Sequence, residues 1–347
     1  MYYGLLLVFS LLPSLLYAQQ SSLDYFLIHP ASARNLAMGE SLVALSGGIE
    51  SVNENPAGLN GMTSQWAARL TRRPPQHNLL FANDDFSRYH YFTAAWRYNA
   101  TNTFAVQYND ADFFALENLP LGQGTGSDRY TATVIGITWA HQLTRELHFG
   151  ITGKRIVSHY YNTATSFAGD MGLLFHKREI IRNQSLVGDF NLAASLSHVG
   201  QGIAYIVESQ KDPLPRHLQT GFVLGIQSTR KHAQLANPIW GAHLAASYQK
   251  SFQPENENWE WGTGMEFDLL QLVFMRFGYH AVRPAISGLL PNKKFETGMT
   301  YGGGVRVPLE KFLKSHIPLT CRFDFSSSPQ GTYIERYSMY SFMMEFR

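Results

Sequence analysis

Side chains capable of chemistry are spread thinly along this sequence. Thirteen histidines occur, but they form no His-Glu-x-x-His pair and no group at metal-ligand spacing. The Gly-x-Ser-x-Gly motif of a nucleophilic serine is missing. The glycine-rich segment 122–126 lacks the Lys-Ser/Thr ending of a phosphate-binding loop. The sequence therefore predicts no catalytic residue, no metal site and no cofactor, and a protein that is not an enzyme.

Arg34 carries the sharpest local hypothesis, because it lies in a segment of small residues that must pack against something larger. An enclosed guanidinium costs several kcal/mol unless it is paired. Four acids alternate with apolar residues and are candidate partners: Asp189, Glu266, Asp268 and Asp324. One interpretation is structural, in which Arg34 holds its segment in place. The other is a gate that opens when a solute or a cargo protein binds.

The acids belong to segments in which every second residue is apolar, the pattern of a strand with two different faces. In 319–326, Leu319, Cys321, Phe323 and Phe325 share one face and polar residues share the other. The segments 189–198 and 259–269 have the same alternation. Such strands have one apolar and one polar surface, so the partners of Arg34 are expected to share one side of a sheet.

About fourteen such strands follow residue 63, many of them ten residues or longer. Ten residues is the length that a tilted strand needs to cross a bilayer, and an even number of such strands is typical of an outer-membrane barrel. After residue 18, no apolar run of about twenty residues is present. A sandwich or a propeller would have shorter strands or a blade-length repeat. The expected strands are 64–72, 88–99, 102–113, 129–142, 146–159, 164–176, 186–199, 215–229, 239–252, 257–269, 271–283, 296–308, 317–327 and 334–346.

Three parts of the chain follow from these patterns. Residues 1–18 resemble a secretory signal peptide, with an apolar run before Ala18, so the mature protein is expected to begin at Gln19. Residues 19–62 are too small and too rich in glycine to form a core of their own, and they are predicted to plug the barrel. Residues 63–347 are the predicted transmembrane barrel.

Composition agrees with a membrane protein. Charged residues make up 16% of the chain and aromatic residues 14%, which is poor in charge and rich in aromatics for a soluble protein. The net charge is +2, with no basic run beyond pairs such as Arg72-Arg73, so nucleic acid is not an expected partner. Cys321 is the only cysteine, which excludes an intramolecular disulfide and a cysteine-based metal cluster. A hydrolase formed by luminal Ser, His and Asp residues is the enzymatic alternative that remains open.

Motifs in the plug and the barrel resemble the FadL-like superfamily, and more closely the PorV/PorQ family of Bacteroidetes-type outer-membrane proteins. The plug motif consists of Ser32, Ala33, Arg34, Met38, Gly39, Asn55, Pro56 and Ala57. Barrel motifs that follow in the same order are Gly153-Lys154, Asp170-Met171-Gly172, 196–200 and 274–279. The chain departs from the family pattern at Glu40, where a second glycine is common, and at His198, where asparagine is favoured. His198 ends a predicted strand beside Gly200 and is expected to cap a turn.

The resemblance implies an outer membrane of a Gram-negative, Bacteroidetes-like cell and two possible functions. PorV and PorQ relatives are accessory barrels of the type IX secretion system, and PorV binds the C-terminal domains of cargo proteins. FadL-like relatives pass hydrophobic small molecules through a plugged barrel. The implied partners are outer-membrane lipid together with either secretion components and cargo, or hydrophobic solutes.

Overall fold

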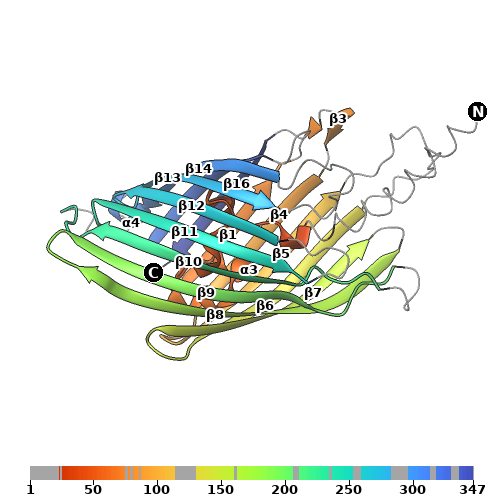
Figure 1. The fold of residues 1–347 in the computed structure, drawn as a ribbon, viewed down its shortest axis with the longest axis horizontal. Coiled ribbons are helices and arrows are strands. Elements are labelled where there is room, and N and C mark those ends of the chain that lie inside the picture. The colour runs from red at the N-terminus through yellow and green to blue at the C-terminus, as the bar shows by residue number, and fades with distance from the viewer. Residues whose placement is uncertain are drawn as a thin grey trace, which may run out of the picture.

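The computed structural model describes residues 23, 26–74, 77–78, 81–85, 87–113, 130–159, 162–205, 211–233, 237–252, 259–282, 296–312, 318–329 and 336–346. Fourteen antiparallel strands form a closed barrel around a plug of short helices (Figure 1). Among the described residues, no helix is both long and apolar enough to cross a membrane. The barrel strands are β1 (Trp66–Arg73), β4 (Ser87–Arg97), β5 (Asn102–Phe113), β6 (Tyr130–Gln142), β7 (Leu147–His159), β8 (Thr163–Arg182), β9 (Leu186–Gly200), β10 (His217–Ser228), β11 (Trp240–Ser251), β12 (Trp259–Leu269), β13 (Val273–Val282), β14 (Glu296–Pro308), β15 (Leu319–Ser328) and β16 (Tyr337–Phe346).

Each strand pairs with its neighbour in sequence, and β1 closes the ring. β1 pairs with β16 on one side and with β4 on the other, so Trp66 faces both Phe346 and Trp96. Closure leaves no strand edge without a partner, which is what a bilayer requires because lipid cannot hydrogen-bond to backbone. The expectation of an antiparallel barrel of about fourteen strands is confirmed.

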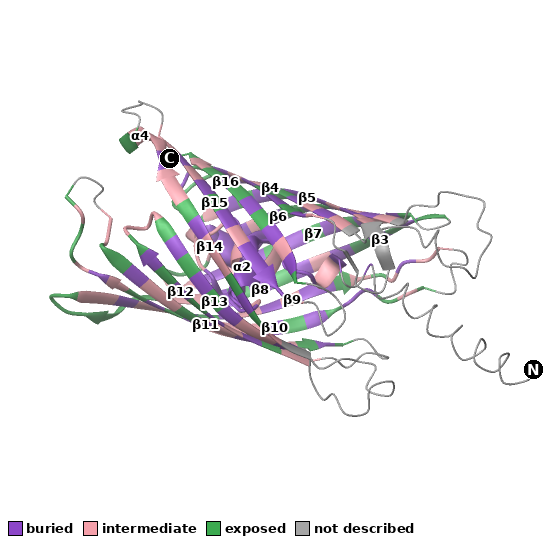
Figure 2. Cartoon of the chain, turned by 90° about the horizontal axis from the view of Figure 1, so that it is seen from above, coloured by how far each residue is buried: buried purple, intermediate pink, exposed green. Residues whose placement is uncertain are grey.

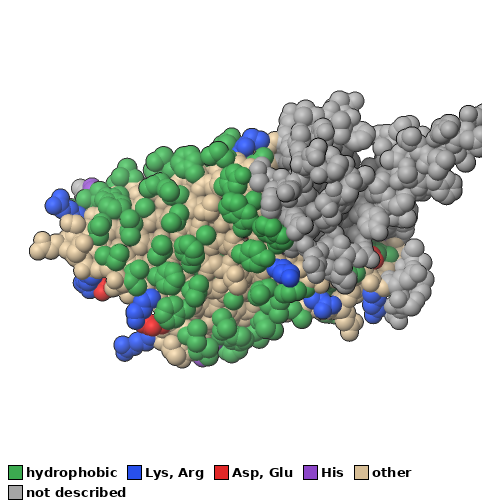
Figure 3. All heavy atoms as spheres, viewed as in Figure 1, with side chains coloured by type: hydrophobic (Ala, Val, Ile, Leu, Met, Phe, Trp, Pro, Cys, Tyr) green, Lys and Arg blue, Asp and Glu red, His purple; other side chains and the backbone are tan. Residues whose placement is uncertain are grey.

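The alternation read from the sequence separates the lumen from the outer surface. In β12, Glu266 is 1% exposed and faces the lumen, whereas the neighbouring Phe267 is 42% exposed and faces outward. Apolar side chains cover much of the outer face in Figure 3. Phe323 and Met344 are outward examples from β15 and β16. This apolar exterior is what a lipid-facing barrel wall requires.

Three elements differ from the sequence expectation. β8 continues to Arg182, well beyond the predicted end at residue 176. Residues Lys177–Arg182 are exposed on both faces and do not alternate, so the sequence pattern did not indicate this part of the strand. A separate two-stranded sheet of β2 (His77–Asn78) and β3 (Phe81–Asp85) lies in the connection between β1 and β4. Neither segment has the period-two pattern on which the prediction rested.

The plug consists of α2 (Ala33–Ala37), the 3₁₀ helices η1 (Leu42–Ala44) and η2 (Pro56–Gly61), and α3 (Ser51–Glu54). It is buried inside the barrel (Figure 2). The helices contact different parts of the wall: α2 contacts β13–β16, η1 contacts β9–β11, and η2 contacts β5–β8. A further short helix, α4 (Leu309–Phe312), lies between β14 and β15. The plug therefore touches most of the luminal circumference, although it is too small to have a core of its own.

The connections differ between the two ends of the barrel. Short ones join β4 to β5, β6 to β7 and β12 to β13 at the end where the plug runs into β1. The N-terminal residues of the plug extend toward the other end, where Phe26 packs against Tyr89 and Tyr91 near the start of β4. The plug thus runs along the lumen from one end toward the other.

Candidate functional site

The first half of the plug motif rests on three glycines of the wall. A Cβ atom added to Gly262, Gly264 or Gly278 would lie 1.9–2.3 Å from the backbone of Met38 or Gly39. No real Cβ atom approaches another atom so closely, so only glycine allows this contact. Gly39 itself has a φ of +63°, a left-handed conformation that glycine adopts without strain. The Met38-Gly39 pair is therefore seated directly on the wall backbone.

The second half of the motif has a matching seat on β7 and β8. A Cβ on Gly150 would lie 2.3 Å from the carbonyl carbon of Pro56, and one on Gly172 would lie 1.9 Å from Asn55 Oδ1. Asn55 Oδ1 accepts a hydrogen bond from the Ala57 backbone N–H at 3.0 Å. Its Nδ2 donates to the carbonyl of Leu173 at 3.2 Å. Asn55 therefore begins η2 and ties it to the wall at the same time.

Ser32 and Ala33 set the direction in which Arg34 points. The Ser32 hydroxyl accepts a hydrogen bond from Asn35 N–H at 3.1 Å and caps α2. The Ala33 N–H donates to Ser341 Oγ of β16 at 3.0 Å. These two bonds fix the first turn of α2 against the wall.

Arg34 binds Glu266 of β12 through two parallel hydrogen bonds. Nε donates to Oε2 at 2.9 Å and Nη2 donates to Oε1 at 2.6 Å. The side chain of Arg34 is 13% exposed and that of Glu266 is 1% exposed. This two-pronged geometry is the strongest form of a guanidinium–carboxylate contact.

Beyond Glu266, a series of charged residues of alternating sign connects Arg34 to a second plug residue, Glu50. Arg276 of β13 donates to Glu266 and, at 2.8 Å, to Asp324 of β15. Arg322 lies 2.9 Å from Asp324 and 3.9 Å from Glu50 of the plug. We call the set Arg34, Glu266, Arg276, Asp324, Arg322 and Glu50 the charged belt.

Glu50 is ionised within this belt. Burial disfavours its charged form, but the guanidinium groups of Arg322, Arg34 and Arg69 outweigh burial and hold the pKa of Glu50 below its usual value. The belt thus has one charged plug residue at each end and four wall residues between them. Its four wall residues come from three strands on one side of the barrel, β12, β13 and β15.

The four predicted acids occupy different places. Glu266 contacts Arg34 directly, and Asp324 is joined to it through Arg276. Asp268 instead accepts a hydrogen bond from the Gln271 N–H at 3.1 Å in the turn between β12 and β13. Asp189 lies against Gly225 of β10. The structure therefore brings two of the four acids to the belt and places the other two elsewhere in the barrel.

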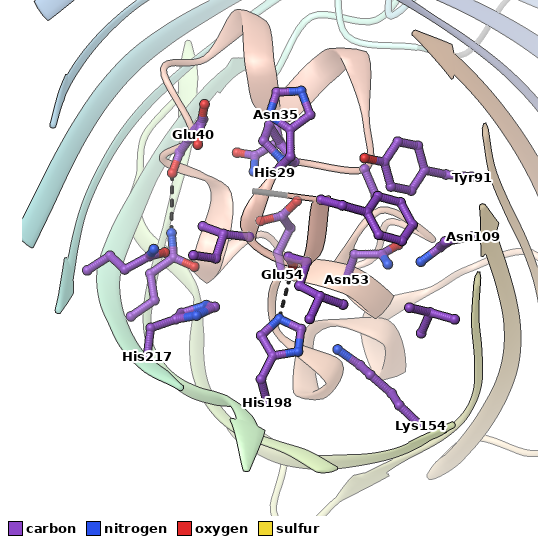
Figure 4. Close-up of a pocket in the computed structure, with 18 residues that line it drawn as sticks. His29, Asn35, Glu40, Asn53, Glu54, Tyr91, Asn109, Lys154, His198 and His217 are labelled. Carbon is purple, nitrogen blue, oxygen red and sulfur yellow. Dashed lines mark hydrogen bonds between the residues drawn. The ribbon is translucent and has the colours of Figure 1, made fainter. Parts of the chain in front are cut away.

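A small polar cavity lies between the N-terminal part of the plug and the wall (Figure 4). Its volume is about 40 Å³, room for about three water molecules. Glu54 projects into it from α3, and His198, His217 and Lys154 line it from the wall. Burial raises the pKa of Glu54 to about 7. The cavity thus has room for a few water molecules and is lined by acidic and basic side chains.

His198 does not cap a turn, contrary to the sequence expectation. It lies in a β-bulge of β9, where Ser197 and His198 stand opposite the single residue Asp170 of β8. The His198 N–H donates to Asp170 Oδ1 at 2.9 Å, and Asp170 also pairs with Lys154 at 2.5 Å. The Nε2 atom of His198 lies 3.0 Å from the carbonyl oxygen of Leu27 in the plug. The bulge turns the imidazole into the lumen, which sequence alternation alone does not predict.

Next to the cavity, apolar and aromatic side chains of the luminal wall surround the buried guanidinium of Arg73, which lies over the rings of Tyr89 and Tyr337 at 4.7 and 4.2 Å. Phe26 is 2% exposed and stacks on Tyr89 at 5.6 Å between ring centres. We call the surrounding patch the apolar bay; its wall residues are Tyr89, Tyr91, Ala111, Ala132, Val134, Ile156, Ala164, Ala168, Ile203, Leu214, Tyr337 and Met339. Barrel lumens are usually polar, and the bay belongs to the largest of three apolar clusters among the described buried residues. Its residues scatter over several strands, and no local motif reveals it.

Glu40, Glu50 and Glu54 were not among the predicted site residues, although each points from the plug to the wall or the cavity. For Glu40 and His198, the sequence did contain one indication of a special role: both residues depart from the family pattern that the plug and barrel motifs resemble. Glu50 and Glu54 had none. Their positions depend on short helices, which are too short to be predicted from a helical periodicity in the sequence.

Comparison with known proteins identifies the fold. No protein-family model matches the chain, and neither does a curated protein. The solved monoaromatic hydrocarbon channel CymD has a TM-score of 0.55 at 11% identity, with 91% of this chain and 97% of that chain covered. The toluene transporter TodX of P. putida has a TM-score of 0.53 at 11% identity, with 92% and 98% covered. The toluene transporter TbuX of Ralstonia pickettii has a TM-score of 0.51 at 13% identity, with 94% and 100% covered.

The chain shares the fold of these channels. The likeness runs through nearly the whole of each chain, plug and barrel together. At 11–13% identity, this likeness shows the fold alone. The narrower PorV/PorQ assignment gains no support from it.

Proposed function

We propose that this protein is an outer-membrane channel for small hydrophobic molecules. The observation that carries the proposal is the apolar bay, which belongs to the largest apolar cluster among the described buried residues and lies on the luminal side of the wall. The N-terminal segment of the plug fills this bay, with Phe26 stacked on Tyr89 and packed at a tilt against Tyr91. A hydrophobic solute would take the place of that segment. The fold shared with hydrocarbon channels supports the same function.

Displacing the segment is energetically feasible. Full burial of a phenylalanine side chain contributes about 2–3 kcal/mol, and an aromatic solute that enters the bay regains a similar amount. For Phe26 alone the exchange is therefore close to neutral. Loss of the buried Leu23 contact and of the His198–Leu27 hydrogen bond adds a cost that the solute concentration must overcome. The adjoining cavity of about 40 Å³ is too small for a drug-sized ligand, so the segment must move before a solute binds.

The test is uptake of a radiolabelled aromatic hydrocarbon by cells that express the chain or its variants. Ile156→Asn places a polar side chain in the bay and should reduce uptake about tenfold, because an unpaired amide in an apolar site costs about 1–3 kcal/mol. The matched control is Leu174→Asn, the same kind of substitution at another fully buried luminal residue, outside the bay. Equal uptake by Ile156→Asn and the wild type, at equal amounts of folded barrel, would refute the channel.

A second candidate is an accessory role in type IX secretion. The order of the plug and barrel motifs favours it, and so does a lumen whose described cavities hold only a few waters. A pull-down from detergent-solubilised outer membrane separates the two functions. Secreted proteins with the conserved C-terminal domain among the partners would support secretion, and bound hydrophobic molecules alone would support the channel.

A further inference from the structure

A second contact between plug and wall lies away from the charged belt, at the turn that follows α2. Glu40 of this turn, Glu260 of β12 and His280 of β13 bring one ligand atom each within 4.8 Å of one another. His280 Nδ1 lies 3.7 Å from Glu40 Oε1, and His280 Nε2 lies 3.5 Å from Glu260 Oε2. Each of the three side chains is 18% exposed. One nitrogen and two oxygen ligands from three separate segments therefore converge on one point.

The spacing of these atoms is wider than that of a direct ion pair. A charge-assisted N–H···O bond closes to about 2.7–2.9 Å, as it does between Arg34 and Glu266. Two ligands bound to one ion at about 2.1 Å and tetrahedral angles are roughly 3.4 Å apart. The two measured separations involve different nitrogens of one imidazole, and only one of these can bind a given ion. The geometric support is therefore that one nitrogen and one oxygen from each carboxylate lie within 4.8 Å of one another, a spacing that side-chain rotation can close to about 3.4 Å.

Glu40 is delivered to this point by a rigid backbone. Its φ is +60°, and its carbonyl oxygen accepts hydrogen bonds from Gln219 Nε2 at 3.3 Å and from Ser247 Oγ at 3.0 Å. The preceding Gly39 is seated on the wall glycines described above. A carboxylate on such a fixed turn is preorganised, so little entropy is lost when it binds an ion.

Space for one ion is available at the same place. A cavity of about 10 Å³, about the size of one water molecule, is lined by Glu40, Glu260 and His280 together with Gln219, Ser247, Gln249, Trp261 and Gly262. Two carboxylates and one imidazole are the ligand types that zinc and similar divalent metals accept, with a water in the fourth position. We propose that Glu40, Glu260 and His280 bind one divalent transition-metal ion that fastens the plug turn to β12 and β13.

The experiment uses Co²⁺ as a spectroscopic probe on the purified full-length barrel after removal of metals with a chelator. The visible absorption of Co²⁺ should rise to saturation at one ion per chain and should be displaced by Zn²⁺. Glu40→Gln and His280→Gln should each lose this signal. The control is His90→Gln, which removes a histidine that lies beside a different carboxylate, Asp110, at 3.3 Å. It should bind Co²⁺ like the wild type.

A second measurement separates a plug–wall staple from an ion bound elsewhere. Zn²⁺ should slow hydrogen exchange of the amides in 36–45 at least tenfold in the wild type, and leave it unchanged in Glu40→Gln and His280→Gln. Absence of saturable Co²⁺ binding by the wild type would overturn the proposal and leave His280 as an ordinary partner of two acids. Binding that is equal in all four proteins would overturn it as well, because the ion would then bind elsewhere. Neither readout depends on which solute the channel carries.

Discussion

Arg34 and Glu266 are the residues through which the plug is most tightly bonded to the wall. Two hydrogen bonds of 2.6 and 2.9 Å join them, in a position largely shielded from water. Glu266 keeps a second partner, Arg276, on the wall. The wall can therefore lose Arg34 without leaving a buried carboxylate unpaired, and the plug is the part that should respond.

Arg34→Ala should loosen the plug and leave the barrel folded. Loss of the charged hydrogen bonds should cost the plug–wall contact about 3 kcal/mol. Uptake of a small hydrophilic antibiotic should rise, while the folded band on an unheated gel remains. Arg34→Lys should be intermediate, because an ammonium cannot form the planar pair of bonds. Arg72→Ala, at an exposed arginine of β1, is the control. Unchanged uptake would mean that Arg34 is neither a fastener nor a gate, and failure of the barrel to assemble would mean that the plug is needed for folding.

The raised pKa of Glu54 predicts that the stability of the docked plug depends on pH. Burial raises its pKa from 4.5 in the open chain to about 7, so an exposed Glu54 loses its proton at lower pH than the buried one. The docked plug should therefore lose stability as the pH rises from about 4.5 to 7, by up to about 3 kcal/mol. Hydrogen exchange of plug amides, corrected for intrinsic rates, should show weaker protection at pH 8 than at pH 5.

Glu54→Gln should abolish this dependence and strengthen protection at pH 8, because the amide carries no charge to desolvate. Glu179→Gln, at an exposed acid in the β8–β9 hairpin, should keep the wild-type behaviour. Equal protection of the wild-type plug amides at pH 5 and pH 8 would contradict a raised pKa of Glu54.

At the scale of elements, backbone-to-backbone packing positions the plug. Gly262, Gly264 and Gly278 receive the Met38-Gly39 turn, and Gly150 and Gly172 receive Asn55 and Pro56. Strand glycines usually weaken a sheet, since they lack a side chain to pack. Here that cost is offset, because the missing Cβ atoms make room for the plug backbone.

Gly278→Ala and Gly172→Ala should each displace the plug from its seat. The new Cβ atoms would stand 2.2 Å from Gly39 N and 1.9 Å from Asn55 Oδ1, and the barrel wall is less free to move than the plug. Antibiotic uptake should increase, with an unchanged folded band. Gly153→Ala provides a matched control, because a Cβ there meets no heavy atom within 4 Å. If Gly153→Ala raised uptake as much as the other two, strand glycines would matter for the wall and not for the plug.

For the whole molecule, the two ends of the barrel differ in the length of their connections. Short turns lie at the end where the plug joins β1, and short turns are typical of the periplasmic side. The segments Gly122–Arg129 and Ala285–Lys294, expected to be extracellular loops, lie outside the described residues. The orientation of the barrel is therefore still a prediction.

Cysteine labelling on whole cells checks this orientation. In a Cys321→Ser background, Gly124→Cys should react with an impermeant maleimide, because the longer connections face the medium. Glu146→Cys, in the short turn between β6 and β7, should stay unlabelled until the cells are broken. Labelling at residue 146 in place of residue 124 would invert the topology.

Much of the barrel follows from the sequence alone. Alternation of the kind seen at Glu266 and Phe267 is a local property, because successive side chains of a strand point to opposite faces. Fourteen such segments and a closed sheet then follow from the need to pair every edge in lipid. The unpredicted end of β8 and the β2–β3 sheet are the segments in which this local signal is missing.

The site was only partly accessible to such reasoning. The sequence indicated that Arg34 would need an acid, since burial of an unpaired guanidinium is costly, and Glu266 was among four candidates. Which acid it meets depends on the position of α2 along the lumen, and that position is set by glycines up to 240 residues away in the chain. Glu50, the bulge at His198 and the convergence of Glu40, Glu260 and His280 likewise depend on contacts between distant segments. Periodicity determines which face of a strand is polar; only the closed barrel, with the plug seated in it, determines which polar side chains meet.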